Sequence, residues 1–231
     1  MKPFEKLAET HAPNGSRFSL HRHDGEYFLK QDGRQLMSST SINSELELAD
    51  LACDFRTGSK SPRVLIGGLG LGFSLKRVLE LVGPTARVDV SELLPEVVAW
   101  NRELLGGLNG KYLADKRVTV MVEDVHRCLK KAGENAYDGI LMDVDNGPTS
   151  FVQPQNSRLY QRNGLELLRY VLKPGGRVAF WSAEREQAFE KTLGRAGFAV
   201  REVASKAHPR AKRAAHFIYV AEVGGNTHQP T

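Results

Sequence analysis

The chain has 231 residues, of which 41% are hydrophobic and 26% are charged, and its net charge is +5. This composition fits a globular domain of ordinary size and excludes collagen-like and low-complexity chains, and no apolar stretch is long enough to cross a bilayer. The two cysteines, Cys53 and Cys128, lack metal-ligand spacing, so we expect neither a disulfide framework nor a metal site. The N-terminus shows no hydrophobic leader, which favours a cytoplasmic protein.

Residues 1–15 are expected to be a flexible arm. Short alternating runs follow at 16–37, and the pairs Asp24-Gly25 and Asp32-Gly33 suit tight hairpin turns, so this stretch predicts a small antiparallel meander. A run with helical spacing, SELELADLACDF, links the meander to the rest of the chain. We therefore predict an N-terminal unit over residues 16–60.

From Arg63 onward, strand-like runs alternate with helix-like runs, and the last two strands have no helix between them. This alternation predicts an α/β fold with a parallel sheet that ends in an antiparallel hairpin, over residues 61–223. The dipeptide Gly83-Pro84 and the tripeptide Pro174-Gly175-Gly176 predict breaks between elements. Trp100 and Trp181 lie in apolar runs and are expected in the core, and residues 224–231 are expected to be a flexible tail.

The end of the first strand in this region predicts a nucleoside site. Four glycines, Gly67, Gly68, Gly70 and Gly72, precede a helix-like run, and such glycines let the backbone turn sharply and touch a ligand at a helix N-terminus. Glu92 ends the second strand, where a carboxylate can accept both hydroxyls of a ribose. The alternative is that Glu92 is only an acid near the start of the next helix.

The third predicted strand ends in Glu123-Asp124, from which a side chain can reach an adenine amino group. An Asp124 that caps the next helix would give the same pattern, so both interpretations stay open.

The fourth predicted strand ends in Asp143 and opens a long polar segment that reaches Tyr160. Long segments of this kind in compact α/β domains are often functional. Asp143 and Asp145 could bind a cationic amine or take its proton. The alternative for the following residues, among them Asn146, is ordinary turn chemistry.

Five stretches together carry a family resemblance: VLIGGLGLG, VDVSELLPEVVAWNREL, VTVMVEDVHRCL, YDGILMDVDNGP and LKPGGRVAFWSA. They resemble the spermidine synthase-like branch of the class I S-adenosylmethionine-dependent methyltransferase fold, over about residues 16–222 of this chain. The resemblance implies a Rossmann-like sheet of seven strands, the last one antiparallel, with a small N-terminal β-meander. It also implies a homodimer built through that meander.

The resemblance also assigns roles to the candidate residues. Gly68, Gly70 and Gly72 would face the methionine part of the nucleoside, Glu92 would bind the ribose and Asp124 the adenine. Gly67 and Glu123 would belong to the same cofactor site. Asp143 would lie next to the reacting sulfonium and, with Asp145, would be catalytic, while Asn146 and Tyr160 would contact the acceptor. The alternative for Tyr160 is packing at the start of the next helix.

Two departures from the family pattern affect the transferred group. The family's glycine motif holds an aspartate that repels the carboxylate of S-adenosylmethionine and holds the amine of its decarboxylated form; Gly70 stands at that place here. Asn146 stands where the family's fourth-strand motif has its second acid. The nucleoside half of the site therefore matches the family, and the aminopropyl half is altered.

We therefore predict a transferase that binds S-adenosylmethionine or decarboxylated S-adenosylmethionine, without a metal, and transfers an aminopropyl or methyl group to a small amine. One alternative is a methyltransferase that acts on a small molecule or on RNA, motivated by the basic segment 205–213, although that segment lacks interleaved aromatic residues and fits a solvated loop better. The other alternative is a nucleoside-binding protein without catalysis, motivated by the altered acids.

Overall fold

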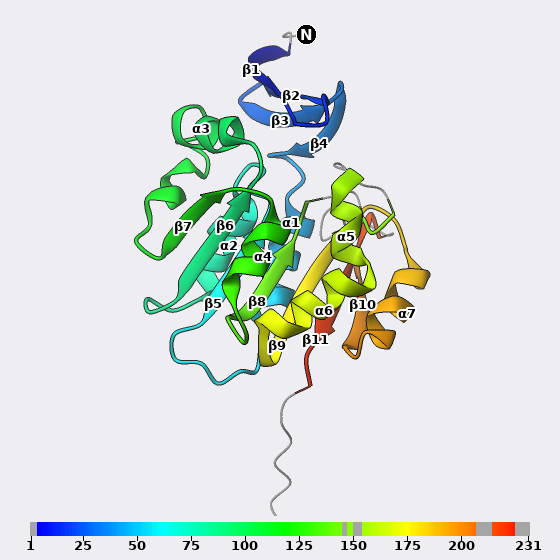
Figure 1. The fold of residues 1–231 in the computed structure, drawn as a ribbon. Helices are drawn as coiled ribbons and strands as arrows, with labels where there is room; N and C mark the ends of the chain where they lie inside the picture. Colours follow the sequence, from blue (N-terminus) through cyan, green and yellow to red (C-terminus); the bar gives the residue numbers. More distant parts are fainter. Residues whose placement is uncertain (1–3, 145–146, 150–153, 207–213, 225–231) are drawn as a thin grey trace, which may run out of the picture.

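The chain forms two β-sheets, which Figure 1 shows as a small sheet above a larger one that is flanked by helices. This computed structural model describes the whole chain except residues 1–3, 145–146, 150–153, 207–213 and 225–231. The small sheet contains β1 (Glu5–His11), β2 (Arg17–His23), β3 (Glu26–Gln31) and β4 (Arg34–Ser38), in that order and antiparallel.

The predicted meander is confirmed, and its two turns have the predicted chemistry. Asp24 and Gly25 both have positive φ (49° and 85°), and so do Asp32 and Gly33 (49° and 83°). Two consecutive residues with positive φ are the signature of the type I′ turn, which matches the twist of the strands it joins.

The predicted flexible arm over residues 1–15 is wrong for most of its length. Residues 5–11 form β1, which pairs antiparallel with β2, and Leu7 and Ala8 pack against the apolar cluster beneath the small sheet. The stretch EKLAETH has no strong strand propensity of its own, so its strand conformation depends on backbone hydrogen bonds to β2.

The larger sheet has the predicted seven strands, and their order is β10-β11-β9-β8-β5-β6-β7. β11 runs antiparallel to both of its neighbours, and the other pairs between β9 and β7 are parallel. The strands are β5 (Arg63–Gly67), β6 (Arg87–Glu92), β7 (Val118–Val122), β8 (Tyr137–Met142), β9 (Leu172–Ser182), β10 (Ala199–Ser205) and β11 (His216–Glu222). The strand order reverses at β5. The next two strands in the chain, β6 and β7, lie on one side of β5, and the later strands lie on the other side, beginning with β8.

Helices cover both faces of the larger sheet. One face packs against α1 (Asn43–Cys53), α2 (Phe73–Leu81) and α3 (Pro95–Glu103) through buried aliphatic side chains. The other packs against α4 (Val125–Ala132), α6 (Arg162–Val171) and α7 (Gln187–Arg195), with four aromatic rings among the buried residues between α7 and the sheet. The remaining short helices are η1 (Gly110–Ala114), η2 (Pro154–Asn156) and α5 (Ser157–Tyr160). Among the described residues, no helix combines the length and apolar character that a bilayer crossing requires.

The small sheet lies over the carboxyl end of the larger one. Phe18, Leu20 and Leu29 of the small sheet share one buried cluster with Leu71 and Trp100, which come from the loop after β5 and from α3. This cluster fixes the small sheet against the edge where ligands bind in sheets of this type.

The predicted break at Pro174-Gly175-Gly176 lies inside β9 instead of between elements. Gly175 has a φ of +76°, and its N–H donates to the carbonyl of Val223 at 3.0 Å. The strand continues through the kink with a register shift against β8, because neighbouring segments supply the hydrogen bonds that the kinked backbone needs.

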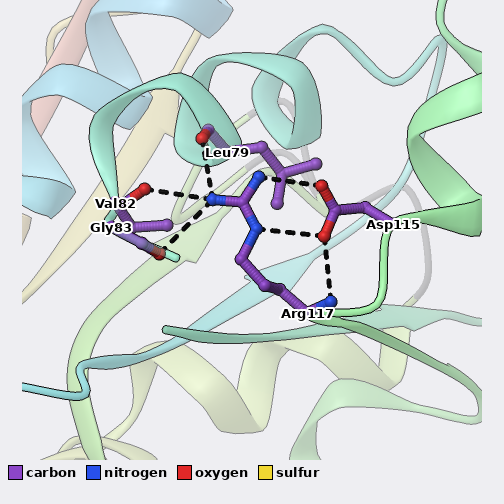
Figure 2. A network of polar contacts seen from close by, with 5 residues as sticks. All are labelled: Leu79, Val82, Gly83, Asp115 and Arg117. Atoms are coloured by element: carbon purple, nitrogen blue, oxygen red, sulfur yellow. Dashed lines mark hydrogen bonds and ion pairs between the residues drawn. The ribbon is translucent and has the colours of Figure 1, made fainter. Parts of the chain in front are cut away.

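Arg117 caps the C-terminal end of α2, as Figure 2 shows. Its guanidinium donates from Nη1 to the carbonyls of Leu79, Val82 and Gly83 at 3.0–3.4 Å, and from Nε and Nη2 to Asp115 at 3.0 and 2.8 Å. Cations are favoured at this end of a helix, where the last carbonyls lack partners within the helix. The contact lowers the pKa of Asp115 from 3.8 to about 2.

We expect Asp115→Asn to destabilise the fold at neutral pH by about 1–2 kcal/mol, because the arginine loses a charged partner. A depressed folded-state pKa stabilises above the unfolded value, so this contribution should disappear as the pH falls from about 4 to about 2. Urea unfolding of both proteins at several pH values measures the difference. Glu166→Gln, in the exposed Arg162–Glu166 pair, is the control and should cost less than about 0.5 kcal/mol. An equal loss in both variants would contradict the capping role.

Candidate active site

A cleft lies at the carboxyl ends of β5, β6 and β8, where the strand order reverses and where doubly wound sheets bind ligands. Its empty volume, including the open mouth, is about 990 Å³. Its walls come from the large sheet and its loops, from the small sheet and from the start of α1. They comprise Phe18, Leu29, Leu36, Met37, Glu45, Gly68, Gly70, Ser91, Glu92, Leu93, Leu94, Val97, Glu123, Asp124, Val125, Asp143, Val144, Asn156 and Trp181.

The glycines after β5 are required first by the protein's own packing. Gly68, Gly70 and Gly72 all have positive φ (91°, 51° and 80°). A Cβ atom at Gly68 would overlap the backbone carbonyl oxygen of Asp143, and one at Gly70 would overlap the sulfur of Met37. The loop therefore fits closely between β8 and the small sheet, and Gly68 and Gly70 still form part of the cleft wall.

Two asparagines that the sequence analysis did not identify hold this loop. Asn101 Nδ2 donates to the carbonyl of Gly70 at 2.8 Å, and Asn109 Nδ2 donates to the carbonyl of Leu71 at 2.9 Å. Both side chains are buried. For Asn101 the sequence offered one signal: it is a polar residue on the face of α3 that is otherwise apolar and buried.

Glu92 lies against the glycine loop, at the end of β6. Its Oε2 accepts the N–H of Leu69 at 3.0 Å, and its Oε1 accepts the N–H of Leu94 at 2.9 Å. Burial raises the pKa of Glu92, and these backbone N–H groups oppose that shift. Glu92 therefore holds the glycine loop and also forms part of the cleft wall.

Asp89, three residues before Glu92 on β6, has a different environment. Its carboxylate pairs with Arg63 at 2.6 Å and accepts the hydroxyl of Tyr137 at 3.0 Å. It is absent from the residues that line the cleft.

Asp124 lines the cleft and also caps α4. The capping interpretation therefore does not exclude a contact with a ligand in the cleft. Its Oδ1 accepts the N–H groups of His126 and Arg127 at 2.9 and 3.3 Å, and it pairs with Arg158 at 2.8 Å. Within the described part of the chain, no hydrogen bond uses Oδ2. The neighbouring Glu123 also lines the cleft, and its carboxylate pairs with Lys131 at 2.7 Å.

Asp143 lies directly after β8 and lines the cleft beside the glycine loop. Its backbone N–H donates to the carbonyl of Gly67 at 3.0 Å, which ties the ends of the two central strands together. The other candidates of this segment, Asp145 and Asn146, lie outside the described residues.

Tyr160 is not among the residues that line the cleft, and its surroundings fit the alternative of packing at the start of a helix; its contact with the acceptor stays a prediction. Its ring is 6% exposed and packs against Phe180 and Phe189, with ring centroids 5.8 and 5.6 Å away. The following helix α6 buries its apolar face in the same cluster, and the aromatic contacts draw Tyr160 into the core.

Three cleft residues were not predicted as site residues: Met37, Glu45 and Trp181. Trp181 was expected in the core but lies on the cleft wall near the end of β9. Met37 and Glu45 come from β4 and the first turn of α1. No local pattern could place them here, because they reach the cleft only through the packing of the small sheet.

The described part of the chain contains no group of three or more His, Cys, Asp or Glu side chains that could hold a metal ion. The residues that line the cleft supply carboxylates and apolar surface.

No family model matches the chain. Among curated proteins it is similar to Polyamine aminopropyltransferase 2 of Streptomyces coelicolor, with 35% identity over 125 residues that make up 53% of this chain and 22% of the relative. It is also similar to Putrescine N-methyltransferase 3 of Nicotiana tabacum, with 32% identity over 119 residues, or 50% of this chain and 29% of the relative. The chain thus spans less than a third of the length of these two relatives.

Among solved structures, the chain is similar to spermidine synthase from Thermotoga maritima, with a TM-score of 0.74 and 15% identity, over 95% of this chain and 73% of that one. At this identity the similarity shows the fold, including the small N-terminal sheet. All the named relatives are transferases, in agreement with the prediction of a transferase. The resemblance of this chain to the spermidine synthase-like branch of the class I S-adenosylmethionine-dependent methyltransferase fold is therefore confirmed.

Proposed function

We propose that this protein binds an S-adenosylmethionine-type nucleoside and transfers an alkyl group, aminopropyl or methyl, from it to a small amine. One observation carries the proposal: a single cleft joins the glycine loop and Glu92 to Asp143 and to a further buried carboxylate, Glu45. The first part suits a nucleoside and the second suits a cationic amine. The names of the relatives, polyamine aminopropyltransferase and putrescine N-methyltransferase, support the same chemistry.

The nucleoside would lie along the ends of β5, β6 and β7. The buried carboxylate of Glu92 would accept the ribose hydroxyls, and Asp124 Oδ2 would accept the adenine amino group. Gly68 and Gly70, which line the cleft, would leave the backbone near the methionine part free of side chains, and Gly67 and Gly72 flank them in the same loop. When bound, the nucleoside supplies a carbon that its sulfonium makes electrophilic.

Asp143 is the residue that would act on the amine. An amine attacks only as the neutral base, so a carboxylate beside it can orient it and take its proton. The rest of the rate enhancement would come from holding donor and acceptor in line within one cleft. Asp145 would assist from the adjacent segment, and Asn146 would contact the acceptor.

The altered part of the site, at Gly70 and Asn146, affects which nucleoside serves as the donor. Position 70 is a glycine, and the sulfur of Met37 lies against it, so no acid at this point repels a donor carboxylate. This favours acceptance of carboxylated S-adenosylmethionine, and hence methyl transfer, beside the aminopropyl transfer that the relatives' names suggest.

We expect Asp143→Asn to lower turnover by at least about a hundredfold while nucleoside affinity changes by less than about threefold, because the amide keeps the shape of the side chain but takes no proton. Single-turnover kinetics together with nucleoside titration separate the two effects. Turnover within about twofold of the wild type would exclude Asp143 as the base.

Product analysis tests the proposed function. The protein is incubated with putrescine and either S-adenosylmethionine or its decarboxylated form, and the amine products are identified by mass spectrometry. A methylated or aminopropylated amine supports the proposal. Nucleoside binding without any product from the two donors would favour the non-catalytic alternative, and methylation of added RNA but not of amines would favour the RNA alternative.

The homodimer remains part of the proposal, with the small sheet as the contact region. Sedimentation of the protein as a monomer at micromolar concentration would refute it.

A further inference from the structure

Glu45 is a buried carboxylate in the wall of the cleft, outside the motifs that suggest the nucleoside site. It lies in the first turn of α1, and the residue is 6% exposed. The wall of the same cleft also includes Leu36 and Met37 from the small sheet and Trp181 from β9. The carboxylate thus shares the cleft with apolar side chains.

The described residues give this carboxylate little compensation for its burial. Ser44 Oγ donates to Glu45 Oε2 at 2.6 Å, and the backbone N–H of Glu45 also contributes. No cationic side chain of the described residues forms an ion pair with it, although buried carboxylates are usually paired. Burial accordingly raises the pKa of Glu45 above its usual value. An ammonium group entering the cleft would supply the missing partner.

A structural role is the competing explanation, because acids near a helix N-terminus stabilise the helix. That role needs no burial, since an exposed acid in the same turn interacts with the same backbone groups. Burial without a cationic partner instead costs stability. The position of Glu45 is therefore better explained by a cation that is part of the bound complex.

The geometry points to Glu45 as the specificity-determining residue that binds a protonated amine of the acceptor, while apolar side chains of the cleft wall contact the acceptor's methylene chain. This inference rests on the proposed function and assigns the acceptor subsite within it. Glu45 binds the amine that does not react, and Asp143 remains with the amine that does.

Calorimetric titration of the nucleoside-loaded protein tests this role without turnover. The protein is saturated with S-adenosylhomocysteine or 5′-methylthioadenosine and titrated with putrescine. Glu45→Gln should weaken putrescine binding by about ten- to hundredfold, because a charge-assisted hydrogen bond is lost. Glu47→Gln, which changes a carboxylate of the same helix outside the cleft, should leave the affinity within about twofold.

The melting temperature gives an independent readout. If Glu45 is held for the amine, Glu45→Gln should melt at the wild-type temperature or above it when no ligand is present. A lower melting temperature with unchanged putrescine affinity would show a structural role and overturn the inference. If Glu45→Gln does not fold, the uncharged variant Glu45→Met replaces it, and putrescine affinity equal to the wild type in that variant would overturn the inference as well.

Failure of the inference differs from failure of the proposed function. Wild-type protein that binds neither nucleoside contradicts the proposed function and the inference together. Wild-type protein that binds nucleoside and putrescine, with Glu45→Gln binding equally well, contradicts the inference alone.

Discussion

Gly68→Ala is expected to abolish nucleoside binding and to destabilise the fold by about 3 kcal/mol or more. Gly68 has a φ of +91°, which a residue with a Cβ atom rarely adopts, and that Cβ would overlap the carbonyl oxygen of Asp143. The obstacle is backbone at the end of a central strand, so it cannot move as a flexible side chain could. Relief requires β5 and β8 to separate at the point where the cleft is formed.

Thermal unfolding and nucleoside titration of the variant measure both effects. Gly107→Ala is the matched control, because a Cβ there meets nothing within 4 Å and its φ is not in the left-handed region. The control should bind nucleoside like the wild type. Wild-type melting and wild-type affinity in Gly68→Ala would show that the loop tolerates a side chain, contrary to the geometry described above.

Glu92→Gln is expected to weaken nucleoside binding by about a hundredfold and to destabilise the protein by about 2–3 kcal/mol. Both oxygens of Glu92 accept backbone N–H groups, from Leu69 and from Leu94. Glutamine replaces one oxygen by an NH₂ group, which sets a donor against a donor in a buried place. The change should therefore loosen the glycine loop and also remove charge from the position proposed to bind the ribose.

Glu96→Gln is the control for this substitution, because Glu96 is exposed in the first turn of α3 and lies outside the cleft. Its effect on stability should stay below about 0.5 kcal/mol. Calorimetry with S-adenosylmethionine and denaturant unfolding provide the two readouts. Equal nucleoside affinity in Glu92→Gln and in the wild type would remove Glu92 from the proposed site.

Local patterns predicted the larger sheet because its elements are strongly periodic. Strand-like and helix-like runs alternate from Arg63 onward, and this alternation allows few topologies. The glycine loop and Glu92 could be placed beside each other because the ends of adjacent parallel strands meet at one edge of the sheet. The turns at Asp24-Gly25 and Asp32-Gly33 were predictable because only a few residue types adopt positive φ.

Features that depend on tertiary packing could not be predicted. β1 is mostly polar and becomes a strand only beside β2. Tyr160 follows the fourth-strand loop in sequence, but the aromatic cluster around Phe180 buries it away from the cleft. Glu45 looks like an ordinary acid at the start of a helix, and only the position of the small sheet reveals that it lines the cleft.

Calorimetric titration of the wild-type protein with S-adenosylmethionine and, separately, with its decarboxylated form tests the central claim most directly. That claim is that the cleft between the glycine loop and Glu92 binds a sulfonium nucleoside. We predict saturable one-site binding of at least one of the two, and its loss in Gly68→Ala but not in Gly107→Ala. Absence of binding for both nucleosides at millimolar concentration would contradict the claim.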